Sequence, residues 1–252
     1  MGQIETNFKP DFPVFDANVA LGRKHNQRVF VDNASDLLKY MSKSGIDRSL
    51  VYSPHSVNFD SIDGNSILIE SINGNNSLIP QFVWSPGIDN MQNAIDTTLK
   101  HDVKSIRFAP LSHRYPFKKW IVNSWLESMV INSISLFISI EEVEPDEIFE
   151  VVKEYPNIKV VLTEIHYRHY PWLIQLLKSL PNINIEISRF VIADGMNILV
   201  NQIGVDRVLY GSRFPDSPFS PQLYSLYFSG LKDDDIKKIT STNLENLLGG
   251  IN

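Results

Sequence analysis

The segment Lys159-Val160-Val161-Leu162-Thr163 decides the fold class. It is an almost continuous apolar run without apolar/polar alternation, which is typical of parallel strands that are covered on both faces. Similar runs recur about once per 31 residues, close to the length of one strand–helix unit. The predicted strands are residues 12–16, 49–53, 79–84, 105–108, 134–140, 159–163, 183–187 and 207–210.

The segments between these runs carry helix signals. Asn33 or Ser35 can cap a helix over 36–44, Asp60 can open one that ends at Ile72, and Asp89 can open another to His101. Further helices are predicted over 118–130, 145–155, 171–180, 192–203, 222–231, 233–239 and 242–248. Eight strand–helix units predict an α/β protein with one domain over residues 1–252, a (β/α)8 TIM barrel. A doubly wound open sheet is the structural alternative.

Composition excludes several classes of function. The chain has 252 residues with 23 Lys+Arg against 29 Asp+Glu, a formal net charge of −6, and no basic run, which disfavours nucleic acid as a partner. The absence of cysteine removes disulfides, thiolate metal sites and cysteine nucleophiles. No stretch approaches the ~18 apolar residues of a membrane span, so we expect no membrane partner and a cytoplasmic location. A homo-oligomer is possible.

Ligand chemistry in such a barrel lies at the carboxyl ends of the strands. The polar or aromatic residues at or just after the predicted strand ends are Asp16, Asn18, His55, Trp84, Arg107, Glu164, His166, Glu186, Arg213 and Asp216. Burying the charged ones without partners would cost several kcal/mol each, so we expect them to pair in a polar mouth. The simpler alternatives are structural ion pairs at the rim, core packing for Trp84 and a turn at Asp216.

Four segments together resemble one family of barrels. They are residues 15–18 (FDAN), 106–108 (IRF), 161–164 (VLTE) and 204–215 (GVDRVLYGSRFP). They resemble the amidohydrolase-related proteins, TIM-barrel hydrolases and decarboxylases of the amidohydrolase 2 type. The resemblance covers nearly the whole chain and implies the same barrel fold.

Active metal-dependent members of that family carry His-x-His on the first strand, one His each on the fifth and sixth strands, and an Asp on the eighth. The resemblance places these positions at Asp16, Asn18, Ser139, Glu164 and Arg213, and none of the five matches. An amide is a poor zinc ligand, and a guanidinium cannot coordinate at all. We therefore expect no cofactor, a divalent metal being possible but disfavoured, and we interpret Arg213 as having taken over the charge of the metal.

The first hypothesis is a hydrolase or lactonase that acts on a small carboxylate-bearing substrate without the usual metal site. Its predicted catalytic residues are Asp16, Glu164, His166 and Arg213, with Asp16 or Glu164 as general base. Its predicted substrate-binding residues are Asn18, His55, Trp84, Arg107, Glu186 and Asp216.

Two alternatives stay open. One is a non-catalytic barrel that binds a small acidic molecule or a protein partner, and the other is a divergent metal-dependent hydrolase using Asp16, Glu164 and His166. In each case Arg213 should lie within direct or water-bridged reach of Asp16 or Glu164, because the first and last strands of a closed barrel are neighbours.

Overall fold

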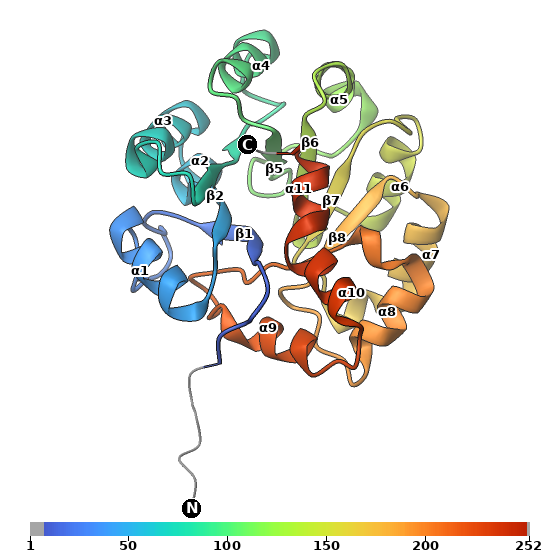
Figure 1. The fold of residues 1–252 in the computed structure, drawn as a ribbon. Helices are drawn as coiled ribbons and strands as arrows, with labels where there is room; N and C mark the ends of the chain where they lie inside the picture. Colours follow the sequence, from blue (N-terminus) through green and yellow to red (C-terminus); the bar gives the residue numbers. More distant parts are fainter. Residues whose placement is uncertain (1–7, 251–252) are drawn as a thin grey trace, which may run out of the picture.

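The computed structural model describes residues 8–250, which form a barrel of parallel strands surrounded by helices (Figure 1). The strands hydrogen-bond in chain order within two groups, β1–β3 and β4–β9. Their bounds are β1 (Phe15–Ala20), β2 (Arg48–Tyr52), β3 (Leu78–Pro80), β4 (Phe82–Val83), β5 (Ser105–Phe108), β6 (Ser135–Ser139), β7 (Val160–Thr163), β8 (Ile183–Glu186) and β9 (Val208–Leu209).

Backbone hydrogen bonds close the barrel at the two places where the strand groups meet. Gln81 lies between β3 and β4, and its backbone N–H donates to the carbonyl of Val51 at 2.8 Å. At the other seam the N–H of Ala17 donates to the carbonyl of Tyr210 at 3.0 Å, and Val19 forms a parallel bridge with Phe214. Each of the eight predicted runs therefore overlaps one stave of a barrel, with 79–84 split into two short strands, and the open-sheet alternative is wrong. The first stave was predicted too early: it spans 15–20 and not 12–16, so Asp16 lies near its start and not at its carboxyl end.

The helices follow the strands around the outside of the barrel. They are α1 (Ala34–Ser44), α2 (Pro54–Asn58), α3 (Ser61–Ile72), α4 (Met91–Lys100), α5 (Lys119–Ile131), α6 (Pro145–Val152), α7 (Tyr170–Ser179), α8 (Gly195–Ile203), α9 (Ser220–Tyr227), α10 (Asp233–Lys237) and α11 (Asn243–Leu247). A π-helical turn, η4 (Lys238–Thr242), joins the last two. No helix within residues 8–250 is long and apolar enough to cross a membrane.

Two of the predicted helix caps are in place and one is displaced by a residue. The side chains of Asn33 and Asp60 cap α1 and α3 as expected. Asn90, not Asp89, caps α4, because the Asp89 carboxylate accepts the hydroxyl of Ser61 and the backbone N–H of Ser85. A carboxylate that holds two neighbouring segments together is not free to cap a helix.

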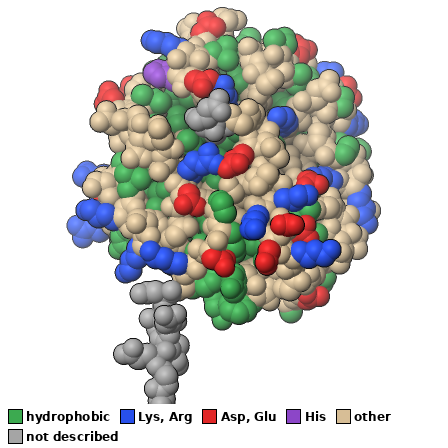
Figure 2. All heavy atoms as spheres, in the orientation of Figure 1, with side chains coloured by type: hydrophobic (Ala, Val, Ile, Leu, Met, Phe, Trp, Pro, Cys, Tyr) green, Lys and Arg blue, Asp and Glu red, His purple; other side chains and the backbone are tan. Residues whose placement is uncertain are grey.

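The barrel interior has its own apolar cluster, separate from the larger core between strands and helices. Inward side chains of the strands fill the half of the interior at the amino ends of the strands, and α11 closes that end with Leu244, Leu247 and Leu248. The carbonyl of Leu247 accepts the Ser135 hydroxyl and the Lys159 ammonium group at the amino ends of β6 and β7. The opposite, carboxyl end of the strands is therefore the end that can be open. Figure 2 shows acidic and basic side chains interspersed over the viewed face, without a large field of one sign.

Candidate active site at the barrel mouth

A polar cavity of about 290 Å³ lies at the carboxyl ends of the strands. Six of its lining residues belong to strands or follow them directly, and they come from four staves, β2, β5, β6 and β7. Its polar lining residues are Tyr52, Arg107, Ser139, Glu141, Glu142, Glu164, Arg189 and Arg213. We call this cavity the mouth.

Arg107 is the deepest cation of the mouth, with only 4% of its surface exposed. Its guanidinium donates to the Gln81 side-chain oxygen at 2.7 Å, to Asn18 Oδ1 at 3.0 Å and, at 3.4 Å, to the Thr163 hydroxyl. It also lies over the ring of Tyr52, 4.1 Å from the ring centre. All these partners are neutral, and no carboxylate among residues 8–250 forms an ion pair with Arg107. A buried guanidinium without a counter-ion is costly for the fold.

Glu164 and Arg213 form an ion pair at the rim of the mouth. Nε of Arg213 lies 2.8 Å from Oε2 of Glu164, which confirms the predicted contact. Both residues follow strands in the left-handed backbone conformation, each with φ of 62°. Such a conformation costs a side-chain-bearing residue about 1–3 kcal/mol and is found where surrounding structure or function requires it. Here the two strained turns bring opposite charges together.

Glu186 lies directly beneath this pair and is fully buried. Its carboxylate accepts the side-chain amide of Asn18 at 3.0 Å, the backbone N–H of Glu164 at 3.1 Å, and both the hydroxyl and the backbone N–H of Ser188. Burial raises the pKa of Glu186 to about 7, against the lowering effect of these donors. Since Asn18 bonds both Arg107 and Glu186, it is the neutral link between the floor of the mouth and this carboxyl group.

Asp16 is buried at the seam between β1 and the segment after β9, and it does not line the mouth. Its Oδ1 accepts the backbone N–H groups of Asn18 and Ser212, while Oδ2 has no partner among residues 8–250. Burial raises its pKa to about 7. The strand pairing shifts between Asp16 and Val19, so simple alternation does not carry Asp16 and Asn18 to the same place.

His166 and Asp216 lie close to the mouth but not on its lining. The ring of His166 packs on that of Tyr167, with centres 4.1 Å apart, and lines a neighbouring hollow with Arg189. Burial, followed by the charge of Arg189, lowers its pKa. Asp216 lies 3.5 Å from Arg213 and binds Lys24 and Gln27 of the segment after β1, so it ties that segment to the rim.

His55 and Trp84 lie away from the mouth. His55 belongs to the short helix α2, and its ring packs on Phe59. The indole N–H of Trp84 donates to the hydroxyl of Thr98 in α4 at 3.0 Å, outside the barrel. Trp84 faces outward because the inward position of this stave is taken by Gln81, which bonds Arg107 and Ser105.

The sequence prediction missed Tyr52, Gln81 and Arg189. Tyr52 is two residues after inward-facing Leu50, so strand periodicity alone could have placed it at the mouth. Gln81 lies within the apolar run 79–84, where no pattern indicates that its side chain points into the barrel. Arg189 comes from the segment after β8, where no periodic signal indicates side-chain direction.

Comparison with known proteins gives a fold but no sequence family. No protein-family model matches the chain, and no curated protein matches it either. Solved structures do match. A 2,6-dihydroxybenzoate decarboxylase from Rhizobium has a TM-score of 0.76 at 11% identity, over 94% of this chain and 98% of that one. A protein from Pseudomonas putida, provisionally assigned as a 2-pyrone-4,6-dicarboxylic acid hydrolase, has a TM-score of 0.72 at 12% identity, over 94% and 98%.

A third structure contains a metal. It is a 5-carboxyvanillate decarboxylase from Novosphingobium aromaticivorans DSM 12444, complexed with manganese and 4-hydroxy-3-methoxy-5-nitrobenzoic acid. Its TM-score is 0.77 at 11% identity, over 94% of this chain and 96% of that one. These similarities confirm that the chain has the fold of the amidohydrolase-related TIM barrels.

The donor set of this chain does not fit the divalent metal that the resemblance implies. Glu164 is paired with a guanidinium, and the amide of Asn18 is already bonded to Arg107 and Glu186. Within the described part of the chain no three His, Asp or Glu side chains are grouped so that they could hold an ion. A permanent cation at the rim would in addition repel a divalent one.

Proposed function

We propose that the protein is a hydrolase or lactonase that acts on a small carboxylate-bearing substrate without a metal ion. The observation that carries this proposal is Arg107, a cation buried at the floor of the mouth whose contacts are all neutral. A substrate carboxylate would supply the missing counter-charge. An arginine fork suits that group because it can donate two parallel hydrogen bonds.

The geometry also supplies groups for an acyl-transfer step. Glu164 is the carboxylate on the mouth lining that contacts both Arg213 and the Glu186 network. In the proposal it takes a proton from the attacking water and returns it to the leaving oxygen when the acyl–oxygen bond of the substrate breaks. Arg213 then stabilises the negative charge that develops on the carbonyl oxygen. Tyr52, beneath Arg107, offers an aromatic surface beside the bound carboxylate.

The comparisons support the substrate class without defining the substrate. The matched proteins are named for chemistry on small carboxylates, and one holds a nitrobenzoic acid derivative. In this chain the carboxyl end of the barrel carries the arginines of the mouth.

A second candidate is a non-catalytic barrel that binds a small acidic molecule. The observation that favours it is that the proposed base, Glu164, is already paired with Arg213, and that the neighbouring Glu186 already accepts four hydrogen bonds. Both candidates need Arg107, and only the first needs Glu164 as a base.

A thermal-shift screen across lactones, sugar acids and aromatic acids tests the shared requirement. A specific ligand at a hundredfold excess over Kd stabilises by ~2.7 kcal/mol. Arg107→Lys keeps the charge but loses the fork, so we expect binding to weaken by about tenfold or more. Arg28→Lys, at an exposed arginine that forms no ion pair within residues 8–250, is the matched control. Equal stabilisation of both variants by every acidic ligand would rule out the mouth as the site.

Turnover separates the two candidates. For any ligand that contains a lactone or ester, hydrolysis is measured by proton release with the wild type and Glu164→Gln. The hydrolase predicts a loss of kcat of about 10²–10⁴-fold with little change in KM, the usual contribution of a positioned base. Binding without turnover in the wild type favours the non-catalytic candidate.

A further inference from the structure

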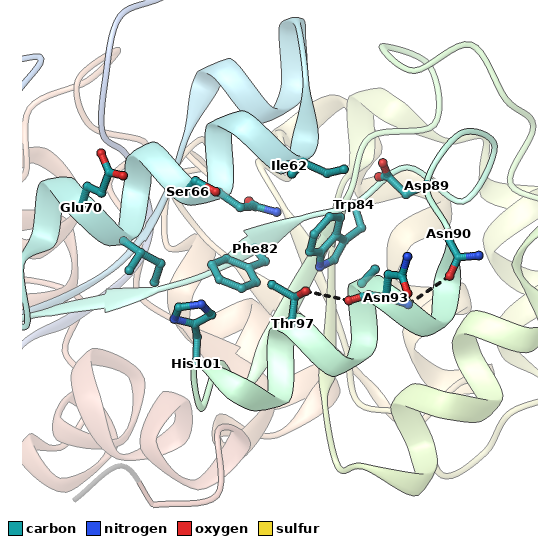
Figure 3. Close-up of a pocket in the computed structure, with 13 residues that line it drawn as sticks. Ile62, Ser66, Glu70, Phe82, Trp84, Asp89, Asn90, Asn93, Thr97 and His101 are labelled. Atoms are coloured by element: carbon teal, nitrogen blue, oxygen red, sulfur yellow. Dashed lines mark hydrogen bonds between the residues drawn. The ribbon is translucent and has the colours of Figure 1, made fainter.

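Outside the mouth, a second cavity of about 320 Å³ lies between α3 and α4, on the outer side of β4 (Figure 3). We call it the α3–α4 groove. The rings of Phe82 and Trp84 form its floor and meet nearly at a right angle, with an interplanar angle of 87°. Its volume is at the lower end of the range of small-molecule sites, about 300–1,000 Å³. Nothing in the proposed hydrolase chemistry uses it.

The polar group of the floor is already committed. The indole N–H of Trp84 donates to the Thr98 hydroxyl, which in turn donates to the carbonyl of Ala94. Phe82 and Trp84 are only 1% and 3% exposed, so the floor offers a ligand limited apolar contact and not a hydrogen bond. Ile62 at the upper wall is 60% exposed, an apolar side chain that a ligand in the groove would cover.

Charge around the groove has one sign. Glu70 and Asp89 stand at its opposite ends in Figure 3, on or next to the two helices, and no Lys or Arg in the described chain lines it. Neither carboxylate forms an ion pair with a cation of residues 8–250. His101 lies at the same end as Glu70, with its ring edge-on to Phe82.

We propose that the α3–α4 groove is a second binding site, which takes a small organic cation with an apolar body, such as an arylalkyl ammonium ion. The apolar body lies on Phe82 and Trp84, and the ammonium group lies toward Glu70. The wall from Ile62 to Glu70 is eight residues of helix, about 12 Å, which limits the length of the ligand. This site is independent of the mouth, where the charge preference is the opposite.

Three probes of matched shape test the charge preference by calorimetric titration of the full chain. They are 2-phenylethylamine, 2-phenylethanol and 3-phenylpropanoate. We expect the amine to bind about fivefold more tightly than the alcohol, which corresponds to ~1 kcal/mol, the upper end for an exposed charge contact. Glu70→Gln should remove most of that preference, whereas Asp96→Asn, an exposed acid of α4 off the groove lining, should not.

Filling the groove tests its location. Asn93→Trp, on the α4 wall, should abolish binding of the amine, and Ser66→Trp does the same from the α3 wall if the first variant does not fold. Arg107→Lys should leave amine binding unchanged, so failure of the mouth and failure of the groove give different results. Equal binding of amine and alcohol, undetectable amine binding, or amine binding that survives both tryptophan variants would overturn the proposal.

Discussion

Within residues 8–250, Arg107 is a buried cation without a carboxylate partner, and Asp16 is a buried carboxyl group without a cationic one. Asn18 contacts both, through its side-chain oxygen and its backbone N–H respectively. The residue Asn18 therefore stands between the charged groups of Arg107 and Asp16, which do not pair with each other. In a salt bridge they would stabilise each other and leave Arg107 less able to bind a carboxylate from solution.

The raised pKa of Asp16 predicts how pH changes stability. Its folded-state pKa of about 7 exceeds that of an unfolded chain, about 4, so the unfolded chain releases this proton first as pH rises. Stability of the wild type should therefore fall relative to Asp16→Asn between about pH 4 and 7, and the difference should stay constant above that range. Urea unfolding of both proteins at several pH values measures it. A difference that does not change with pH would contradict the assignment.

The sequence predicts that Arg213 and Glu164 form an ion pair. It does not predict the positions of side chains that depend on strand register or on an unusual backbone conformation. Arg213 and Glu164 meet as predicted because they follow the carboxyl ends of β9 and β7, the two strands that flank β8. The position of Asp16 was not predictable, because a register shift inside β1 leaves no compositional mark. His166 also lies off the lining of the mouth, because Glu164 has a left-handed backbone conformation that changes the direction of the chain. No sequence signal predicts that conformation at a glutamate.

At the element scale, boundaries are predictable where a cap or a pure apolar run defines them. β5 lies over 105–108 as predicted, and α1 ends at Ser44 before Gly45, whose φ of 72° suits glycine. The run 79–84 is split at Gln81, whose side chain points into the barrel and accepts a hydrogen bond from Arg107. An apolar run cannot show such a break, since its residues fit either face.

The cap of α1 gives a prediction at this scale. Asn33→Ala removes the side-chain oxygen that accepts the N–H of Asp36 at 3.0 Å, and should lower the free energy of unfolding by about 1 kcal/mol. Chemical denaturation measures the loss. Asn26→Ala, at an exposed asparagine in the preceding segment, is the control and should change stability little. Equal losses in the two variants would mean that the cap is not what stabilises α1.

At the scale of the whole molecule, α11 closes the lower end of the barrel. Leu244 is 1% exposed and packs inside the interior cluster with residues of several staves. Leu244→Ala should therefore cost about 2–5 kcal/mol, the range for a buried leucine that leaves a cavity. Leu99→Ala, at a half-exposed leucine of α4, should cost far less. Thermal unfolding compares the two, and similar transition temperatures would show that α11 does not support the barrel.

The hydrogen bond from Ala17 to Tyr210 sets the order of events during synthesis. It joins the first and last staves, so the barrel cannot close while the ribosome still holds the final segment. Until then β1 can pair only with β2, and its other edge faces solvent. Asp16 lies on that edge and is ionised in an unfolded chain at neutral pH, and a charge at such a position opposes pairing with another nascent chain. Burial of the Asp16 carboxyl group destabilises the closed barrel, but before closure the same group opposes association of the exposed β1 edge with other chains.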